Sequence, residues 1–181
     1  SPGWRPRWEH AAVSFNNAVC VMGGGADFGK YDDVWRSSDG ITWMKIGTLP
    51  TAVRGHCAEV FKNKLFVFGG LDEDDKLLQE IWVSEDGAGW EIVEEYALWP
   101  ARTRHASAMY NNKLWLAGGT TEEGDNSDVW RSRDGIEWQE VAADSGCGCV
   151  CNDGETKSWK DFWGDMLLVG TSLLILMYYR K

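Results

Sequence analysis

Apolar and polar positions follow a period-two pattern at three places in this chain, and each time the pattern predicts a β-strand. The stretches HAAVSF (residues 10–15), HCAEVF (56–61) and HASAMY (105–110) show this period. Each is followed by a dipeptide containing Asn, which tolerates the positive φ of a tight hairpin, and then by an apolar run, AVCVMGG, LFVFGG or LWLAGG. The pattern predicts three hairpins at matching positions.

Two further strands are predicted after each hairpin. The third strands are DDVWRS (32–37), QEIWVS (79–84) and SDVWRS (127–132). They run into the related phrases SSDGITW, SEDGAGW and SRDGIEW, in which Asp-Gly is a strong hairpin signal and the last Trp lies in a fourth strand. Each unit is therefore expected to be a four-stranded antiparallel meander, and the fold class of this part of the chain all-β.

The three units align almost without gaps, with His-to-His spacings of 46 and 49 residues. Such a period indicates a repeat architecture. The units lie at about residues 8–47, 54–94 and 103–143 of a body that covers 5–143. The repeated positions are the glycines Gly23, Gly24, Gly69, Gly70, Gly118 and Gly119, the third-strand tryptophans Trp35, Trp82 and Trp130, and the fourth-strand tryptophans Trp43, Trp90 and Trp138.

These residues resemble the kelch repeat, in which a Gly pair follows an apolar strand and aromatic residues occupy the third and fourth strands. The resemblance implies that each unit is a blade of a β-propeller. It also implies that the Gly pairs permit close backbone approach and that the tryptophans fill the space between blades. The SxDGxxW phrase is similar to the Asp-box of sialidase-type propellers but lacks one residue between Asp and Gly, so we interpret it as hairpin chemistry without a catalytic role.

Three blades are fewer than the four to eight of a closed propeller, so the predicted propeller is incomplete. The outer sides of the first and third blades would be apolar and uncovered. A second copy, another subunit or further residues of the protein could cover them. Among these three, we expect another subunit.

The composition changes after the third unit. Residues 144–158 form a Gly/Cys linker, and 159–181 contain an apolar segment and a short basic tail. Residues 162–179 carry one charge, Asp165, and as a helix would extend about 27 Å, close to the roughly 30 Å of a bilayer's hydrocarbon core. We expect one C-terminal transmembrane α-helix, whose small residues Gly170, Thr171 and Ser172 could pack against another helix. A buried helix of a water-soluble protein is the alternative.

The charge balance and the cysteines restrict the partners. The net charge is −10, which disfavours nucleic acid. The Cys147, Cys149 and Cys151 cluster does not have the spacing of a zinc site, and a disulfide, a link to a partner or acylation all remain open. The chain begins at Ser1, so a targeting peptide could precede it. Lysines and arginines are equally numerous on the two sides of the apolar segment, so the positive-inside rule does not determine the orientation of the predicted helix in the membrane. We expect the body to lie outside the cytosol.

The candidate site is a loop face rather than a catalytic centre. Each His recurs at one position per unit, which indicates a structural role, and no catalytic group, cofactor site or metal site is predicted. Loops after the second and fourth strands should share one face, and this face is the candidate binding surface. The alternative is that its acidic residues form only a solvated rim. A calcium site at residues 72–75 is possible, but the run lacks the spacing of an EF-hand loop. The candidate interaction residues are Arg54, His56, Asp72, Glu73, Asp74, Asp75, Trp99, Arg102, Arg104, His105, Glu122 and Glu123.

Together these features predict a non-catalytic, membrane-anchored interaction module of the kelch type. We expect a single-pass accessory subunit whose partners are the other protein subunits of a larger membrane complex, such as a respiratory or photosynthetic assembly of an organellar inner or thylakoid membrane. A carbohydrate-binding or carbohydrate-oxidising propeller fragment is one alternative. A soluble kelch adaptor is another.

Overall fold

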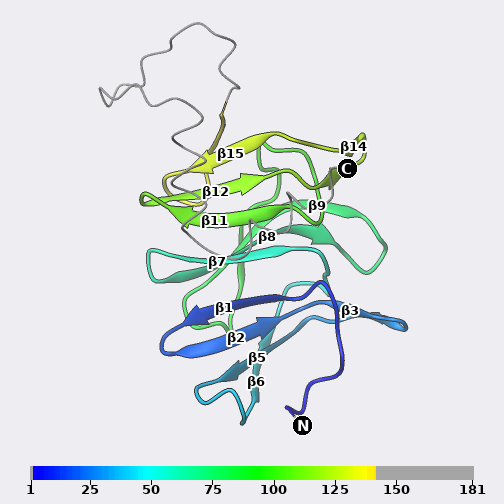
Figure 1. Ribbon diagram of the computed structural model, residues 1–181, viewed down its shortest axis with the longest axis vertical. Helices are drawn as coiled ribbons and strands as arrows, with labels where there is room; N and C mark the ends of the chain where they lie inside the picture. The colour runs from blue at the N-terminus through cyan, green and yellow to red at the C-terminus, as the bar shows by residue number, and fades with distance from the viewer. Residues whose placement is uncertain (1, 142–181) are drawn as a thin grey trace, which may run out of the picture. The chain divides into compact units, whose positions relative to one another are not determined.

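The computed structural model describes residues 2–141, which form three four-stranded antiparallel sheets (Figure 1). The all-β prediction is confirmed for this part of the chain. The linker at 144–158, the segment at 162–179 with Gly170, Thr171 and Ser172, and the cysteine cluster lie outside the described residues. Within residues 2–141, no helix has the length and apolarity needed to cross a membrane.

Each sheet is a meander of consecutive long strands, which we call blades 1, 2 and 3. Blade 1 contains β1 (Ala11–Phe15), β2 (Ala18–Met22), β5 (Asp33–Ser37) and β6 (Met44–Thr48). Blade 2 contains β7 (Cys57–Phe61), β8 (Lys64–Leu71), β9 (Leu77–Ser84) and β10 (Glu91–Glu94). Blade 3 contains β11 (Ala106–Tyr110), β12 (Lys113–Ala117), β15 (Val129–Ser132) and β16 (Trp138–Glu140). Two small hairpins, β3–β4 (Gly25–Ala26, Gly29–Lys30) and β13–β14 (Thr120–Thr121, Gly124–Asp125), extend from blades 1 and 3.

The first hairpin of every blade turns through two residues with positive φ. The angles are 48° and 57° at Asn16 and Asn17, and nearly the same at residues 62–63 and 111–112. Two successive positive φ angles define a type I′ turn, whose twist matches that of the strands it joins. The Asn residues therefore supply the turn geometry that the sequence predicted.

The Ser-x-Asp-Gly phrase closes the turn between the third and fourth strands with side chains. In blade 1, Ser37 Oγ accepts a hydrogen bond from the Gly40 amide (2.9 Å), and one oxygen of Asp39 accepts from the next two backbone amides (2.8 and 2.7 Å). Blades 2 and 3 repeat these bonds. The backbone amides lower the pKa of Asp39 to about 2. Because these turns take several residues, Trp43 and Trp90 precede the fourth strand instead of lying within it.

Neighbouring blades pack side by side, with first strand next to first strand (β1 by β7, β7 by β11) and one apolar core between each pair. Trp82 and Trp90 of blade 2 belong to the core shared with blade 1. Trp130 and Trp138 of blade 3 belong to the core shared with blade 2, where Trp138 meets the Phe68 ring edge-on at 5.5 Å. Each blade thus inserts its tryptophans against the preceding blade.

In blade 1, which has no preceding blade among the described residues, the N-terminal segment covers part of this side. The Trp4 ring meets Trp43 edge-on at 5.8 Å and lies 6.3 Å from the ring of His10. Gly3 lies against Trp35. In blade 3, Trp99 makes the equivalent contacts with Trp138 and His105. The segment before each of these two blades therefore contributes a tryptophan to the same side of the sheet.

Candidate interaction face

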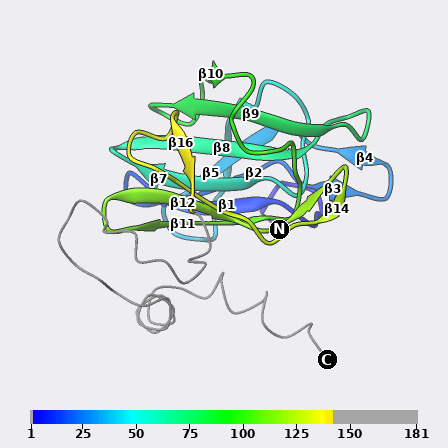
Figure 2. The same ribbon diagram turned by 90° about the horizontal axis from the view of Figure 1, so that it is seen from above.

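The loops after the second and fourth strands meet at one end of the blades, and we call this end the loop face. Isolated bridges join Trp8 to Gly25, Arg54 to Leu71, and Thr103 to Thr120. Each segment that enters a blade therefore pairs with the end of that blade's second strand or with the hairpin just after it. Figure 2 shows both small hairpins, β3–β4 and β13–β14, at this end. The loop face is therefore held by backbone pairing to the rigid sheets.

The residue before each blade's His builds a backbone ladder across the loop face. Glu9, Gly55 and Arg104 all have positive φ, at 52°, 65° and 55°. The Gly55 amide donates to the Glu9 carbonyl (3.0 Å), and the Arg104 amide donates to the Gly55 carbonyl (2.8 Å). The left-handed conformation at this position thus links each blade to the next.

Charged side chains on this face form one network around Glu9. One carboxylate oxygen of Glu9 pairs with Arg54 (3.0 Å) and the other accepts from Nε of Arg104. Arg54 also approaches Asp75 (3.6 Å), which pairs with Lys30 (2.7 Å). The hydrogen bond from Lys30 is the main cause of the lowered pKa of Asp75. The structure thus brings together three of the predicted residues, Arg54, Asp75 and Arg104, through a carboxylate that the prediction omitted.

Two aromatic side chains are exposed beside this network. The guanidinium of Arg54 lies over the Trp8 ring at 4.8 Å, and Trp8 is 45% exposed. Phe28 lies at the tip of the β3–β4 hairpin and is fully exposed. Neither was predicted from the sequence. The only sequence signal for Phe28 is an aromatic residue in the turn-forming stretch ADFGK, where a side chain has no neighbouring strand to pack on.

Four predicted residues of the interaction face are instead buried between blades, which corrects the prediction. Trp99 and Arg102 have no exposed surface, and His56 and His105 are each 6% exposed. Burial lowers the pKa of His56 to about 4 and that of His105 to about 3. These side chains fill the inter-blade space, because the chain crosses from one blade to the next where they occur.

Arg102 forms a buried ion pair that the sequence reading missed. Both outer nitrogens of its guanidinium bind the Asp128 carboxylate (2.6 and 2.7 Å), and one also donates to the Gly118 carbonyl (2.8 Å). Trp130 Nε1 donates to the same carboxylate (2.7 Å). Burial alone would raise the pKa of Asp128, but the bonds from Arg102 and Trp130 outweigh it, so the pKa is lowered.

Blade 1 repeats the arrangement with Arg7, Asp33 and Trp35. Blade 2 does not: Val53 stands at the position of the Arg, and Glu80 accepts the hydrogen bond from Trp82 Nε1. The signal in the sequence is an Arg three residues before His together with an Asp two residues before the third-strand Trp. The pair fixes the entry segment of a blade to its third strand.

The predicted acidic residues lie in two separate loops. Asp72 accepts from the amides of Asp74 (3.0 Å) and Lys76 (2.9 Å), so it stabilises its own turn between β8 and β9. Glu73 and Asp74 are exposed there, and Glu122 and Glu123 are exposed at the tip of the β13–β14 hairpin. Within residues 2–141, no group of three or more His, Cys, Asp or Glu side chains is positioned to hold a metal ion.

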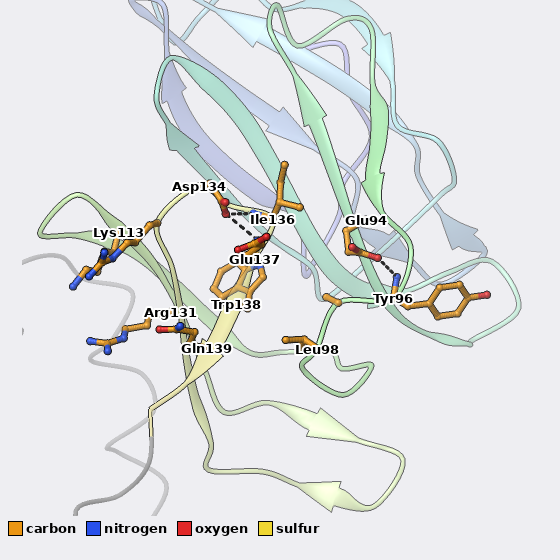
Figure 3. A pocket seen from close by; sticks show the side chains of 12 residues that line it. Glu94, Tyr96, Leu98, Lys113, Arg131, Asp134, Ile136, Glu137, Trp138 and Gln139 are labelled. Atoms are coloured by element: carbon orange, nitrogen blue, oxygen red, sulfur yellow. Dashed lines mark hydrogen bonds between the residues drawn. The ribbon is translucent and has the colours of Figure 1, made fainter. Parts of the chain in front are cut away.

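An open cavity of about 720 Å³, lined by none of the residues of the Glu9 network, lies between the loop after β10 and strand β16 (Figure 3). Trp138 lies between a side with Lys113 and Arg131 and a side with Glu94 and Leu98. Its lining contains basic, acidic and apolar side chains and none of the predicted interaction residues.

Comparisons with known proteins agree with this architecture. The KLHDC2/KLHL20/DRC7 Kelch-repeats domain family matches residues 9–149. The chain is 29% identical over 149 residues to the kelch repeat protein M-T8 of Myxoma virus (strain Lausanne), covering 71% of this chain and 28% of the viral protein. It is 27% identical over 131 residues to an F-box/kelch-repeat protein of Arabidopsis thaliana, covering 63% and 27%.

The tRNA wybutosine-synthesizing protein 2/3/4 of the same plant is 28% identical over 153 residues, covering 74% of this chain and 15% of that protein. The matched region thus amounts to about a quarter, or less, of the length of these relatives.

Proposed function

The chain belongs to the kelch-repeat family, and from this premise we propose that its blades are a non-catalytic protein-interaction module whose loop face contacts the partner. The observation that carries the proposal is the exposure of Phe28 and Trp8 on that face. Exposed aromatic side chains on a rigid scaffold are frequent anchors of protein interfaces. Glu9 and its arginines give the same surface a fixed charge pattern that can select a partner.

We further propose that residues 162–179 anchor the module in a membrane as an accessory subunit of a larger complex. The support is in the sequence: an apolar stretch long enough to span, with Trp159 and Trp163 at one end and Tyr178 and Tyr179 at the other. An organellar energy-converting assembly, respiratory or photosynthetic, suits such a small subunit. Carbonate extraction tests the anchor: the full chain should remain with the membrane, and release into the soluble fraction would contradict it.

A purification from native membranes under mild detergent tests the loop face. Phe28→Ala and Trp8→Ala should each reduce the amount of co-purifying subunits at least tenfold, since anchor residues at interfaces each contribute about 2 kcal/mol or more. Ile41→Ala is the matched control, because Ile41 is 80% exposed but lies in the Ser37–Trp43 turn at the opposite end of blade 1. Equal recovery with all three variants would refute the loop face as the binding surface.

A further inference from the structure

In blades 1 and 2, the Gly pair lies between two histidines, one from its own blade and one from the next blade. A Cβ added to Gly23 would lie 2.6 Å from Cε1 of His56, and one added to Gly69 would lie 3.0 Å from Cε1 of His105. The second Gly of each pair lies against the His of its own blade. The first Gly therefore opens a socket that the His of the following blade fills.

The first and the last described blade each carry one member of this contact without the other: blade 1 has the His, and blade 3 has the Gly. His10 is exposed, whereas His56 and His105 are buried. At Gly118, which is only half-buried, the nearest described atom to an added Cβ is the Asn126 carbonyl oxygen at 3.4 Å. Within the described residues, blade 1 thus presents a plug without a socket, and blade 3 presents a socket without a plug.

The side of blade 1 that carries His10 has the character of a buried inter-blade surface. Val19 is 42% exposed, although the equivalent residues Leu65 and Leu114 are completely buried. Ala12 is likewise exposed where Ala58 of blade 2 is buried. Exposed apolar residues at positions that are core in the sister blades indicate a surface that another sheet covers.

The backbone ladder of the loop face ends in matching groups. Its next donor would be the Glu9 amide and its next acceptor the Arg104 carbonyl, and the ladder within residues 2–141 uses neither. The free ends of blades 1 and 3 are therefore complementary in shape and in backbone hydrogen bonding.

We propose that a second copy of this chain covers both free sides, head to tail, with His10 of each copy seated against Gly118 of the other. Two copies contribute six blades, within the four to eight of known propellers, and the two-fold arrangement leaves neither a free plug nor a free socket. The second copy is the partner of choice because it carries every complementary group in the same register. This inference goes beyond the proposed function and does not depend on it.

The test is the mass of the full chain in mild detergent, measured by light scattering with the detergent contribution subtracted. The wild type should have twice the 20.3 kDa of one chain. Val19→Asp places a charge in the joint, and Gly118→Asn fills the socket with a residue that tolerates the local φ of +64°. Each variant should give a single chain. The controls Tyr96→Asp and Gly89→Asn, at exposed positions of the middle blade and the loop that follows it, should retain the pair.

Mixing separates a head-to-tail joint from a symmetric one. The Val19→Asp chain keeps its socket and the Gly118→Asn chain keeps its plug, so an equal mixture should recover pairs joined once. Near-UV circular dichroism establishes that each variant has folded blades. A folded wild type with the mass of one chain overturns the proposal, as do variants that remain paired, a mixture that stays single, or a wild type that pairs with a different kelch protein instead of itself.

Discussion

The buried ion pair of blade 3 gives the sharpest stability prediction, which is the cost of removing its negative charge. Asp128→Asn keeps the shape of the side chain and an acceptor for Trp130, but leaves the Arg102 guanidinium, whose side chain has no exposed surface, without a counter-charge. Breaking a buried pair on one side usually costs about 3–5 kcal/mol. We expect about 3 kcal/mol for this conservative change, a large share of the roughly 5–15 kcal/mol that stabilises a typical domain.

The assay is urea unfolding of the full chain in mild detergent, followed by tryptophan fluorescence. Glu122→Gln, which removes a charge at an exposed hairpin tip, is the control and should change the free energy of unfolding by less than about 0.5 kcal/mol. Adding Arg102→Met to Asp128→Asn should restore about 1–2 kcal/mol, because an apolar chain of similar length needs no counter-charge. Blade 2 already has Val53, fully buried, at this position.

The reasoning would be refuted by either of two results. If Asp128→Asn costs no more than the Glu122→Gln control, the pair does not stabilise the blade. If Arg102→Met deepens the loss caused by Asp128→Asn, the unpaired buried charge is not the origin of that loss. Either outcome would assign the stability of blade 3 to its apolar contacts alone.

Three further predictions follow from the same structure. Burial lowers the pKa of His105 to about 3 from the ordinary 6.5, so below pH 6.5 the unfolded chain binds a proton that the folded chain does not bind. The free energy of unfolding should therefore fall by about 2 kcal/mol between pH 7 and pH 5. Urea unfolding of His105→Gln should show a pH dependence smaller by that amount. Asp86→Ala removes the acceptor of the Ala88 and Gly89 amides and should lower the free energy of unfolding by about 1–2 kcal/mol. Glu85→Ala, at the exposed neighbouring residue, should change it by less than about 0.5 kcal/mol. Equal effects would contradict a stabilising role of these turn hydrogen bonds. Gly69→Ala should destabilise the unpaired chain (Val19→Asp background) by more than about 2 kcal/mol beyond Gly118→Ala in thermal unfolding. Both glycines have a similar positive φ (+55° and +64°), but within one chain only Gly69 lies against the Arg102 carbonyl and the His105 ring. Similar losses would show that φ strain alone decides.

The sequence predicted the parts of this fold that depend on local chemistry. Strand positions, the Asn turns and the Ser-x-Asp-Gly turns each follow from a few adjacent residues, and the structure contains all of them. The threefold repetition multiplied these weak local signals. A period near fifty residues therefore determined the fold class more firmly than any one strand could.

The candidate site was harder to predict because side chains that share a loop do not share an environment. Arg54 and Arg102 both lie near the start of a blade, yet one reaches the loop face and the other is buried with Asp128. The sequence cannot show which direction such a side chain takes until its partner is known. Phe28 was missed because its one local signal, an aromatic residue in the turn-forming stretch ADFGK, does not recur in the other two blades.

The backbone ladder of Glu9, Gly55 and Arg104 bears on how this surface can evolve. Blades are tied to each other through main-chain groups that need a positive φ at these three positions but depend on no residue of the hairpins beyond them. Those hairpins contribute few side chains to the cores. Insertions and substitutions in those hairpins should therefore change the free energy of unfolding only slightly. Related proteins could differ in the partner they bind through changes in three short loops, while the sheets stay the same.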